Sequence, residues 1–358
     1  MIKFKLLLYF LRLGFTAFGG PLAIIAQLQL DLVENKKLVT EKDFKESLSL
    51  IKSLPGPVAT QVLTFNAYRI GGLWFSLIAT ILFVLPSFLM MVLLAAYYDQ
   101  FRTDPQIMLF LDGMQAGALV LIAVALYSLT KGNLKQSRFW IFFFLSVILL
   151  GPLKVFEPIV IVGAGVAGIL TQNIKINKNQ LKSILPLDIF LVCLKAGGLV
   201  FGTGFAIIPL LQNDFVNIHQ WVTKDQFMDA IAFGQLTPGP VTITVSFVGY
   251  RAAGWMGASL ATFGVFLPGV FNMTTWFPRA FSWFSKQSWV KAFVTGATAA
   301  IAAGIVVAIF SLSETTSMLK LIVPILIFVV SLKKKIPSWA IVIGSGAGWW
   351  IFWRLLHS

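Results

Sequence analysis

Residues 54–57 read Leu-Pro-Gly-Pro, and residues 237–240 read Thr-Pro-Gly-Pro. The two Pro-Gly-Pro tripeptides start 183 residues apart. At that constant spacing, residues 14–62 match residues 197–245 at 18 positions without a gap. Agreement of that length is hard to obtain by chance, so the chain is an internal duplication.

The duplication continues beyond these stretches. After a gap of one residue the agreement resumes, for example at Tyr68-Arg69 and Tyr250-Arg251. We therefore expect two homologous halves, an N-terminal repeat over residues 1–180 and a C-terminal repeat over residues 181–358.

The composition indicates an integral membrane protein. Hydrophobic residues make up 58% of the chain and charged residues only 12%, and the mean hydropathy is +0.85, so too little polar surface remains to cover a soluble globule. Apolar runs lie at about 4–30, 71–98, 107–130, 187–211, 254–277, 290–312, 317–332 and 337–356. Most reach the roughly 20 residues that a membrane helix needs, and they do not alternate residue by residue as β-barrel strands do. We expect an all-α, polytopic protein embedded in the lipid bilayer.

The net charge of +14 lies mostly in short loops and predicts the topology. Basic residues mark the cytoplasmic side, which places the N-terminus and the loops at 131–138, 279–291 and 333–335 inside. The second half must then enter the membrane from the opposite side, as an inverted repeat. Parallel halves stay open as an alternative. Residues 139–170 can form one kinked crossing, which gives inverted halves, or two short crossings, which give parallel halves. Inverted halves would also leave the basic loop at 175–182 outside. The basic residues form no aromatic-interleaved face, so we expect no nucleic-acid partner.

Each half also contains two sites where a helix must break. The stretch from Leu13 to Pro21, with Gly14 and Gly19-Gly20, interrupts the first apolar run. The stretch from Gly197 to Gly204, with Gly202-Thr203-Gly204, stands at the same place in the second half. The alternative for these glycines is close helix packing through small residues. Capping-box patterns at Thr40 and Thr223 predict helices that start at about residues 41 and 224 and run into Pro-Gly-Pro, where the prolines end them.

Broken helices at membrane depth favour a transport site. They expose backbone amides and a partial positive charge that attracts anions, and paired breaks in two repeats are the best sequence indication of a site near the midplane. Hydroxyls, amides and cations cluster around the breaks. The candidate anion ligands are Gly19, Gly20, Lys52, Pro55, Gly56, Pro57, Thr60, Gln61, Arg69, Lys195, Gly202, Thr203, Gln235, Thr237, Pro238, Gly239, Pro240, Thr242, Thr244 and Arg251.

Charged residues near the apolar runs are functional candidates because burial in a bilayer is costly. Glu46 and Asp229 occupy equivalent positions in the two halves and are candidates for proton coupling. For each polar candidate there is also an ordinary structural interpretation. A hydroxyl can bond another helix, Lys52 can extend to the interface, and an acid can pair with a lysine.

The residues around these breaks resemble the chromate ion transporter family in its long form with two homologous halves. The likeness rests on Gly14 to Pro21, Leu54 to Pro57, Tyr68-Arg69 with Gly72, Leu85-Pro86, Phe201-Gly202, Gln235 to Pro240, Gly249 to Trp255 and Leu267-Pro268-Gly269. The resemblance implies a bacterial inner-membrane exporter of chromate, with sulfate as the natural look-alike anion. Three positions depart from the family pattern: Ile24 and Ile207 stand where histidine is common, and Lys52 where glutamine is common. These departures bear on the substrate and the coupling ion.

Enzyme chemistry is disfavoured. The only histidines are His219 and His357, and Cys193 is the single cysteine, so no histidine-based triad or multi-cysteine metal site can be assembled. No phosphate-cradling loop is present, and we expect no cofactor and no metal. The sequence therefore predicts a secondary transporter driven by the membrane potential, a proton gradient or both. A passive anion channel using the same breaks is the alternative, and the oligomeric state stays open, with a homodimer among the options.

Overall fold

The computed structural model describes residues 2–52, 54–131, 133, 136–153, 155, 157–169, 185–200, 204–284, 288–313, 318–334 and 336–357. Every regular element in these ranges is a helix, which confirms the all-α prediction. The first half contains α1 (Ile2–Thr16), α2 (Gly20–Gln29), the π-helix η1 (Leu30–Asn35), α3 (Glu41–Ile51), α4 (Val58–Gly71), α5 (Leu73–Ala96), α6 (Tyr98–Arg102), α7 (Pro105–Thr130), α8 (Ser137–Leu150) and α9 (Glu157–Ile169).

The second half repeats this order. It contains α10 (Leu185–Leu199), the 3-10 helix η2 (Gly204–Ile207), α11 (Ile208–Gln212), the π-helix η3 (Asn213–Ile218), α12 (Lys224–Leu236), the 3-10 helix η4 (Val241–Ile243), α13 (Thr244–Thr274), α14 (Phe277–Phe284), α15 (Ser288–Ser313), α16 (Met318–Lys334) and α17 (Ser338–His357). The two π-helices occupy matching positions, at the same spacing as the sequence repeat.

Four described segments are long and apolar enough to cross a membrane: Leu73–Ala96, Pro105–Thr130, Val241–Thr274 and Thr295–Ser313. Large apolar side chains stay exposed on two of them, including Trp74, Ile81 and Phe263. Such a surface suits contact with lipid rather than water. Shorter apolar helices lie at Phe139–Leu150 and Leu319–Val330.

The predicted helix starts at Thr40 and Thr223 are confirmed. The Thr40 hydroxyl accepts a hydrogen bond from the Asp43 amide at 3.1 Å, and α3 begins at the next residue. Thr223 forms a complete capping box with Gln226, with bonds of 3.2 and 3.0 Å, and α12 begins directly after it. Each cap provides an acceptor or donor for a backbone group that the first helical turn leaves unpaired.

Glycines set the same close helix contact in both halves. A Cβ atom at Gly14 would collide with the carbonyl of Phe83, which brings α1 against α5. A Cβ atom at Gly197 would collide with the carbonyl of Val265 in the same way, between α10 and α13. For these two glycines the packing interpretation therefore holds.

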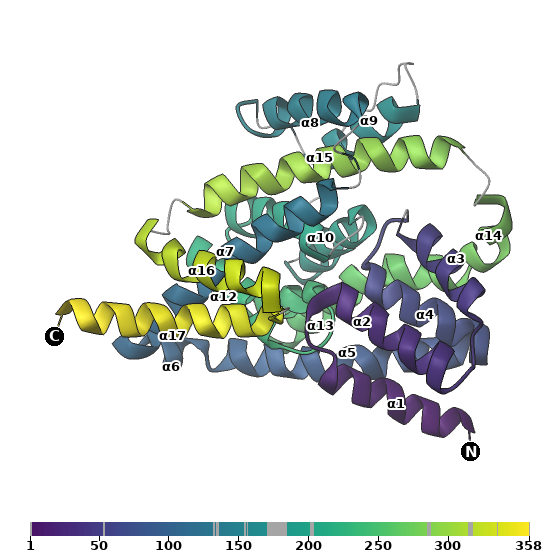
Figure 1. The fold of residues 1–358 in the computed structure, drawn as a ribbon, viewed down its shortest axis with the longest axis horizontal. Coiled ribbons are helices and arrows are strands. Elements are labelled where there is room, and N and C mark those ends of the chain that lie inside the picture. Colours follow the sequence, from purple (N-terminus) through teal and green to yellow (C-terminus); the bar gives the residue numbers. More distant parts are fainter. Residues whose placement is uncertain are drawn as a thin grey trace.

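The two chain ends lie at opposite ends of the longest axis (Figure 1). The short helix α6 lies near the C-terminal end of that axis, whereas α14, its counterpart in the second half, lies near the opposite end with α3. Helix α7 packs against α17, and α15 packs against α9, so these equivalent pairs each join one half to the other.

Candidate functional site

The first Pro-Gly-Pro segment connects two helices and is bonded to the second half of the chain. Helix α3 ends at Ile51 and α4 begins at Val58, with Gly56 at a φ of 130° between them. The Gly56 amide donates to the carbonyl of Val200 at 2.6 Å. The Pro55 carbonyl accepts from Gln61 Nε2 at 2.7 Å and from Asn272 Nδ2 at 3.2 Å.

The second Pro-Gly-Pro segment has the same construction. Helix α12 ends at Leu236 and the next helical residue is Val241, with Gly239 at a φ of 103° between them. The Gly239 amide donates to the carbonyl of Ala17 at 2.9 Å. Ala17 and Val200 occupy the same position in the two repeats, so the two bonds are crossed: each tripeptide is satisfied by the other half.

Both segments also lie directly against a membrane helix of the other half. A Cβ atom at Gly56 would lie 3.1 Å from the Cα of Gly269 on α13, besides colliding with the Gln61 side chain. A Cβ atom at Gly239 would lie 2.9 Å from the hydroxyl oxygen of Ser87 on α5. Because both glycines also have a φ that L-residues rarely adopt, no larger residue fits either position without strain.

The candidate hydroxyls and amides fall into two groups. The first group is bonded to nearby backbone: Thr237 donates to Gly234 at 3.3 Å and Thr244 to Val241 at 2.9 Å. The second group consists of buried atoms with no hydrogen-bond partner in the part of the chain that the structure describes: Thr60 Oγ1, Gln61 Oε1, Gln235 Nε2 and Thr242 Oγ1. Burying such atoms without a partner costs free energy, so each needs an explanation. The Thr60 and Thr242 hydroxyls and the Gln235 amide are donors beside the two breaks, which is the chemistry that an oxyanion requires.

Three of the four candidate cations are held in ion pairs. Arg69 pairs with Asp43 at 3.1 Å. Arg251 pairs with Asp99 at 2.8 Å, and Lys195 with Asp214 at 2.5 Å. The fourth candidate, Lys52, is exposed at the end of α3.

The Asp43 carboxyl group lies at the exposed start of α3. Its pKa is lowered, first by hydrogen bonding with Thr40 and then by the nearby charge of Arg69. The Asp43 carboxylate therefore stays ionised at neutral pH, and its pair with Arg69 joins the start of α3 to the end of α4.

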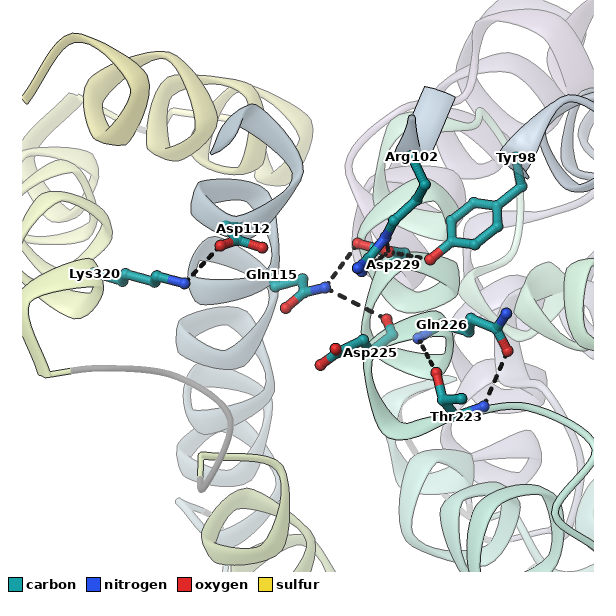
Figure 2. Close-up of polar contacts among 9 residues, drawn as sticks. All are labelled: Tyr98, Arg102, Asp112, Gln115, Thr223, Asp225, Gln226, Asp229 and Lys320. Atoms are coloured by element: carbon teal, nitrogen blue, oxygen red, sulfur yellow. Dashed lines mark hydrogen bonds and ion pairs between the residues drawn. The ribbon is translucent and has the colours of Figure 1, made fainter. Parts of the chain in front are cut away.

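The two candidates for proton coupling lie in opposite environments. Asp229 is fully buried, and its carboxylate accepts from Tyr98 Oη at 2.5 Å, Arg102 Nη2 at 2.6 Å and Gln115 Nε2 at 2.9 Å (Figure 2). Glu46, at the same position in the first repeat, is exposed. The partners of Asp229 were not identified from the sequence. The one indication of them in the sequence was that the charged residue Arg102 borders a long apolar run.

The glycine segments are described in part. Gly19 and Gly20 are partly exposed and have φ angles of 105° and 75°, at the start of α2. Pro21 follows in the first turn, and no side chain caps this helix. Gly202 and Thr203 lie outside the described residues.

An apolar cavity of about 340 Å³ lies between α5 and α13. Its lining residues correspond in the two repeats, as Leu85 does to Leu267 and Thr80 to Thr262. The Thr80 hydroxyl bonds Thr64 and the Thr262 hydroxyl bonds Ser246. With these hydroxyls engaged and no charged residue in the lining, the cavity does not suit an anion.

The family model described as "Chromate transporter" matches the chain twice, over residues 4–169 and 187–350. The "Chromate transport protein" of Cupriavidus metallidurans is 32% identical over 99% of this chain and 94% of its own length. The "Probable chromate transport protein" of Synechococcus elongatus is 30% identical over 96% of this chain and 94% of its own length. The "Chromate transport protein" of Pseudomonas aeruginosa is 29% identical over 96% of this chain and 91% of its own length. No solved structure is significantly similar to the chain.

Proposed function

The chain belongs to the chromate transporter family, and on that premise we propose that it exports chromate, with sulfate as a second dianion of the same shape, across the bacterial inner membrane. It is a multi-pass membrane protein with a transport rather than an enzymatic role. The anion binds between the two Pro-Gly-Pro breaks. The observation that carries this proposal is the set of unpartnered buried donors on Thr60, Thr242 and Gln235.

The location of these donors supports an anion site. Thr60 and Thr242 each stand within one helical turn of the second proline of their tripeptide, and Gln235 stands three residues before Pro238. A dianion that accepts from all three would remove the cost of leaving them unpaired, and charge-assisted hydrogen bonds are stronger than neutral ones. Lys52 would add long-range attraction from the exposed end of α3, whereas Arg69, Arg251 and Lys195 could contribute only after leaving their ion pairs.

The arrangement of equivalent helices supports inverted halves. The Phe88 ring, late in α5, contacts the Trp255 ring in α13 just after its kink, with centroids 6.3 Å apart. Asp99, just past the end of α5, pairs with Arg251, which lies just before the kink in α13. The equivalent helices thus run antiparallel, and α6 and α14 lie at opposite ends of the molecule (Figure 1).

Helices α8 and α9 bear on the alternative of parallel halves. They have 14 and 13 residues, and each is shorter than the roughly 20 residues of a full crossing. Both pack against α15 and follow one another along it (Figure 1). Together they suit one interrupted crossing, which is the arrangement that inverted halves require.

The membrane potential can drive this export. Moving a negative charge outward across an inside-negative potential releases about 2.3 kcal/mol per charge for each 100 mV. A dianion therefore gains about 4.6 kcal/mol per 100 mV, so efflux needs no nucleotide. Proton exchange through Glu46 is compatible with its exposure, whereas Asp229 would first have to leave Arg102.

The test uses everted membrane vesicles that contain the protein and radiolabelled chromate or sulfate. We expect uptake of both anions into the vesicles, faster with a potential than without one, and mutual competition between them. Faster entry of labelled chromate into vesicles preloaded with unlabelled chromate, or accumulation beyond the level that the imposed potential sets, identifies a carrier. A passive channel shows neither. Vesicles that take up neither anion above the level of empty membranes would contradict the proposed function.

A further inference from the structure

The helices that lead into the two breaks are held very differently, and we propose that Asp229 and Arg102 form a gate that closes the second break on the side where α6 lies. This inference rests on the proposed transport function, because it assigns the gate to the same anion path. The gate consists of Asp229 on α12 and the first-half residues that hold it, Tyr98, Arg102 and Gln115.

All three residues bind one buried carboxylate and come from the other half of the chain. Tyr98 and Arg102 belong to α6 and Gln115 to α7, whereas Asp229 belongs to α12 (Figure 2). Arg102 donates to Asp229 Oδ2 through both Nη2 and Nε, at 2.6 and 3.2 Å. Gln115 donates to the other carboxylate oxygen. A buried ion pair with its hydrogen-bonding groups satisfied resists opening, because removing one partner leaves an uncompensated charge.

The gate covers the second break from both sides. The Tyr98 ring packs edge-on against Phe233 and Phe247, with centroids 6.4 and 5.3 Å apart. Phe233 lies in α12 before Pro-Gly-Pro, and Phe247 lies in α13 after it. A side chain that touches both the incoming and the outgoing helix holds the break in one arrangement.

At the first break the matching contact is apolar: the Phe277 ring of α14 packs edge-on against the Phe65 ring of α4, with centroids 5.2 Å apart. Glu46, which corresponds to Asp229, is exposed, and Lys52, which corresponds to Gln235, is exposed as well. Pro55 is half-buried, whereas Pro238 is buried. The described state is therefore more open at the first break than at the second, as expected for one end state of an alternating-access carrier.

Helix α7 indicates on which side of the membrane the gate lies. This helix starts directly after α6, is long enough to cross the membrane and ends beside Lys131. The basic loop after it is expected inside, so α6 and the gate lie on the outer side. Release of the anion to the outside then requires Asp229 and Arg102 to separate.

The experiment measures access to the second break without measuring transport. Thr237, which is buried beside Pro238, is replaced by cysteine after Cys193, the only natural cysteine, is replaced by alanine. A membrane-impermeant maleimide is then applied from the outer side to the full-length protein in oriented vesicles. With the gate intact we expect slow labelling. Asp229→Asn and Arg102→Gln should each label about tenfold faster, because each removes the ion pair that biases the equilibrium toward the closed state.

The chain offers a matched control on the same helix. Asp112 of α7 pairs with Lys320 of α16 at 2.6 Å, and Lys320 approaches α7 from the side away from α12 (Figure 2). Lys320→Gln removes an ion pair to α7 but not a contact to α12, so it should not change the labelling rate. Arg102→Lys, which keeps the charge with fewer donors, should give an intermediate rate.

Three results would overturn the gate. They are an unchanged rate in both Asp229→Asn and Arg102→Gln, an equal increase in Lys320→Gln, and an increase that appears only for reagent applied from the inner side. If either charge variant fails to insert, Tyr98→Phe decides the question, because it keeps the ring packing and removes one donor. It should accelerate labelling, and an unchanged rate would refute the gate. If the gate variants label faster but the protein transports neither chromate nor sulfate, the result would support the gate and refute the proposed substrates.

Discussion

Replacing Thr242 with valine removes a hydroxyl that has no partner in the described structure while keeping the branched shape of the side chain. Thr242 is fully buried. Without a bound anion the change should not destabilise the protein, because it removes an unpaired polar atom rather than a hydrogen bond. With an anion bound, the lost charge-assisted hydrogen bond is worth about 1.5–3 kcal/mol, which corresponds to a rise of about 10- to 150-fold in the half-saturation concentration.

Thr244 supplies the matched comparison two residues along the chain. It is also buried, but its hydroxyl already donates to Val241 at 2.9 Å. Thr244→Val should therefore lower the unfolding free energy by about 1 kcal/mol and leave the half-saturation concentration unchanged. Chromate uptake into everted vesicles and thermal unfolding in detergent measure the two quantities. The reasoning fails if Thr242→Val shifts half-saturation by less than about twofold or if both variants shift it equally.

Gly197→Ala should lower the unfolding free energy by about 1–3 kcal/mol, because its Cβ would overlap the Val265 carbonyl. Gly198→Ala should be tolerated, because its Cβ would lie 3.9 Å from Pro268. Equal melting temperatures of the two variants would contradict this prediction. Lys52→Gln should weaken anion binding by less than about 1 kcal/mol, because the exposed lysine attracts the anion only at long range, and Lys52→Glu by more. Identical half-saturation in wild type and both variants would remove Lys52 from the site. Single cysteines in place of Lys131 and Lys334, without Cys193, should both be labelled only from the cytoplasm, and labelling of position 334 from outside would argue against inverted halves.

Local features were predictable from the sequence because their causes are local. The starts of α3 and α12 follow from a threonine and a residue three positions later. The positions of the two tripeptides between helices follow from the conformational limits of proline. The close approach at Gly14 and Gly197 was anticipated only as an alternative, since the sequence does not name the opposing carbonyl groups.

The pairing of charges was not predictable, because it depends on how distant segments meet. Asp229 and Arg102 lie 127 residues apart, and no periodicity connects them. Neighbouring threonines were equally indistinguishable by sequence. Whether Thr242 or Thr244 is already bonded depends on helix geometry at the break, where η4 precedes α13. The site is therefore defined by fold-dependent hydrogen bonds that composition and spacing do not encode.

The crossed hydrogen bonds of the two tripeptides have a consequence for biogenesis. The acceptor of the Gly56 amide, Val200, is synthesised 144 residues later, and Asn272, which donates to Pro55, later still. At a translation rate of about 5–20 residues per second, the ribosome needs about 7–30 s to reach residue 200 after residue 56. During that interval the nascent first half has a backbone donor without its final acceptor, which is costly inside a bilayer. We therefore expect the early half to wait at the translocon or the membrane surface until its partner arrives, held nearby by the continuous chain at a high effective concentration.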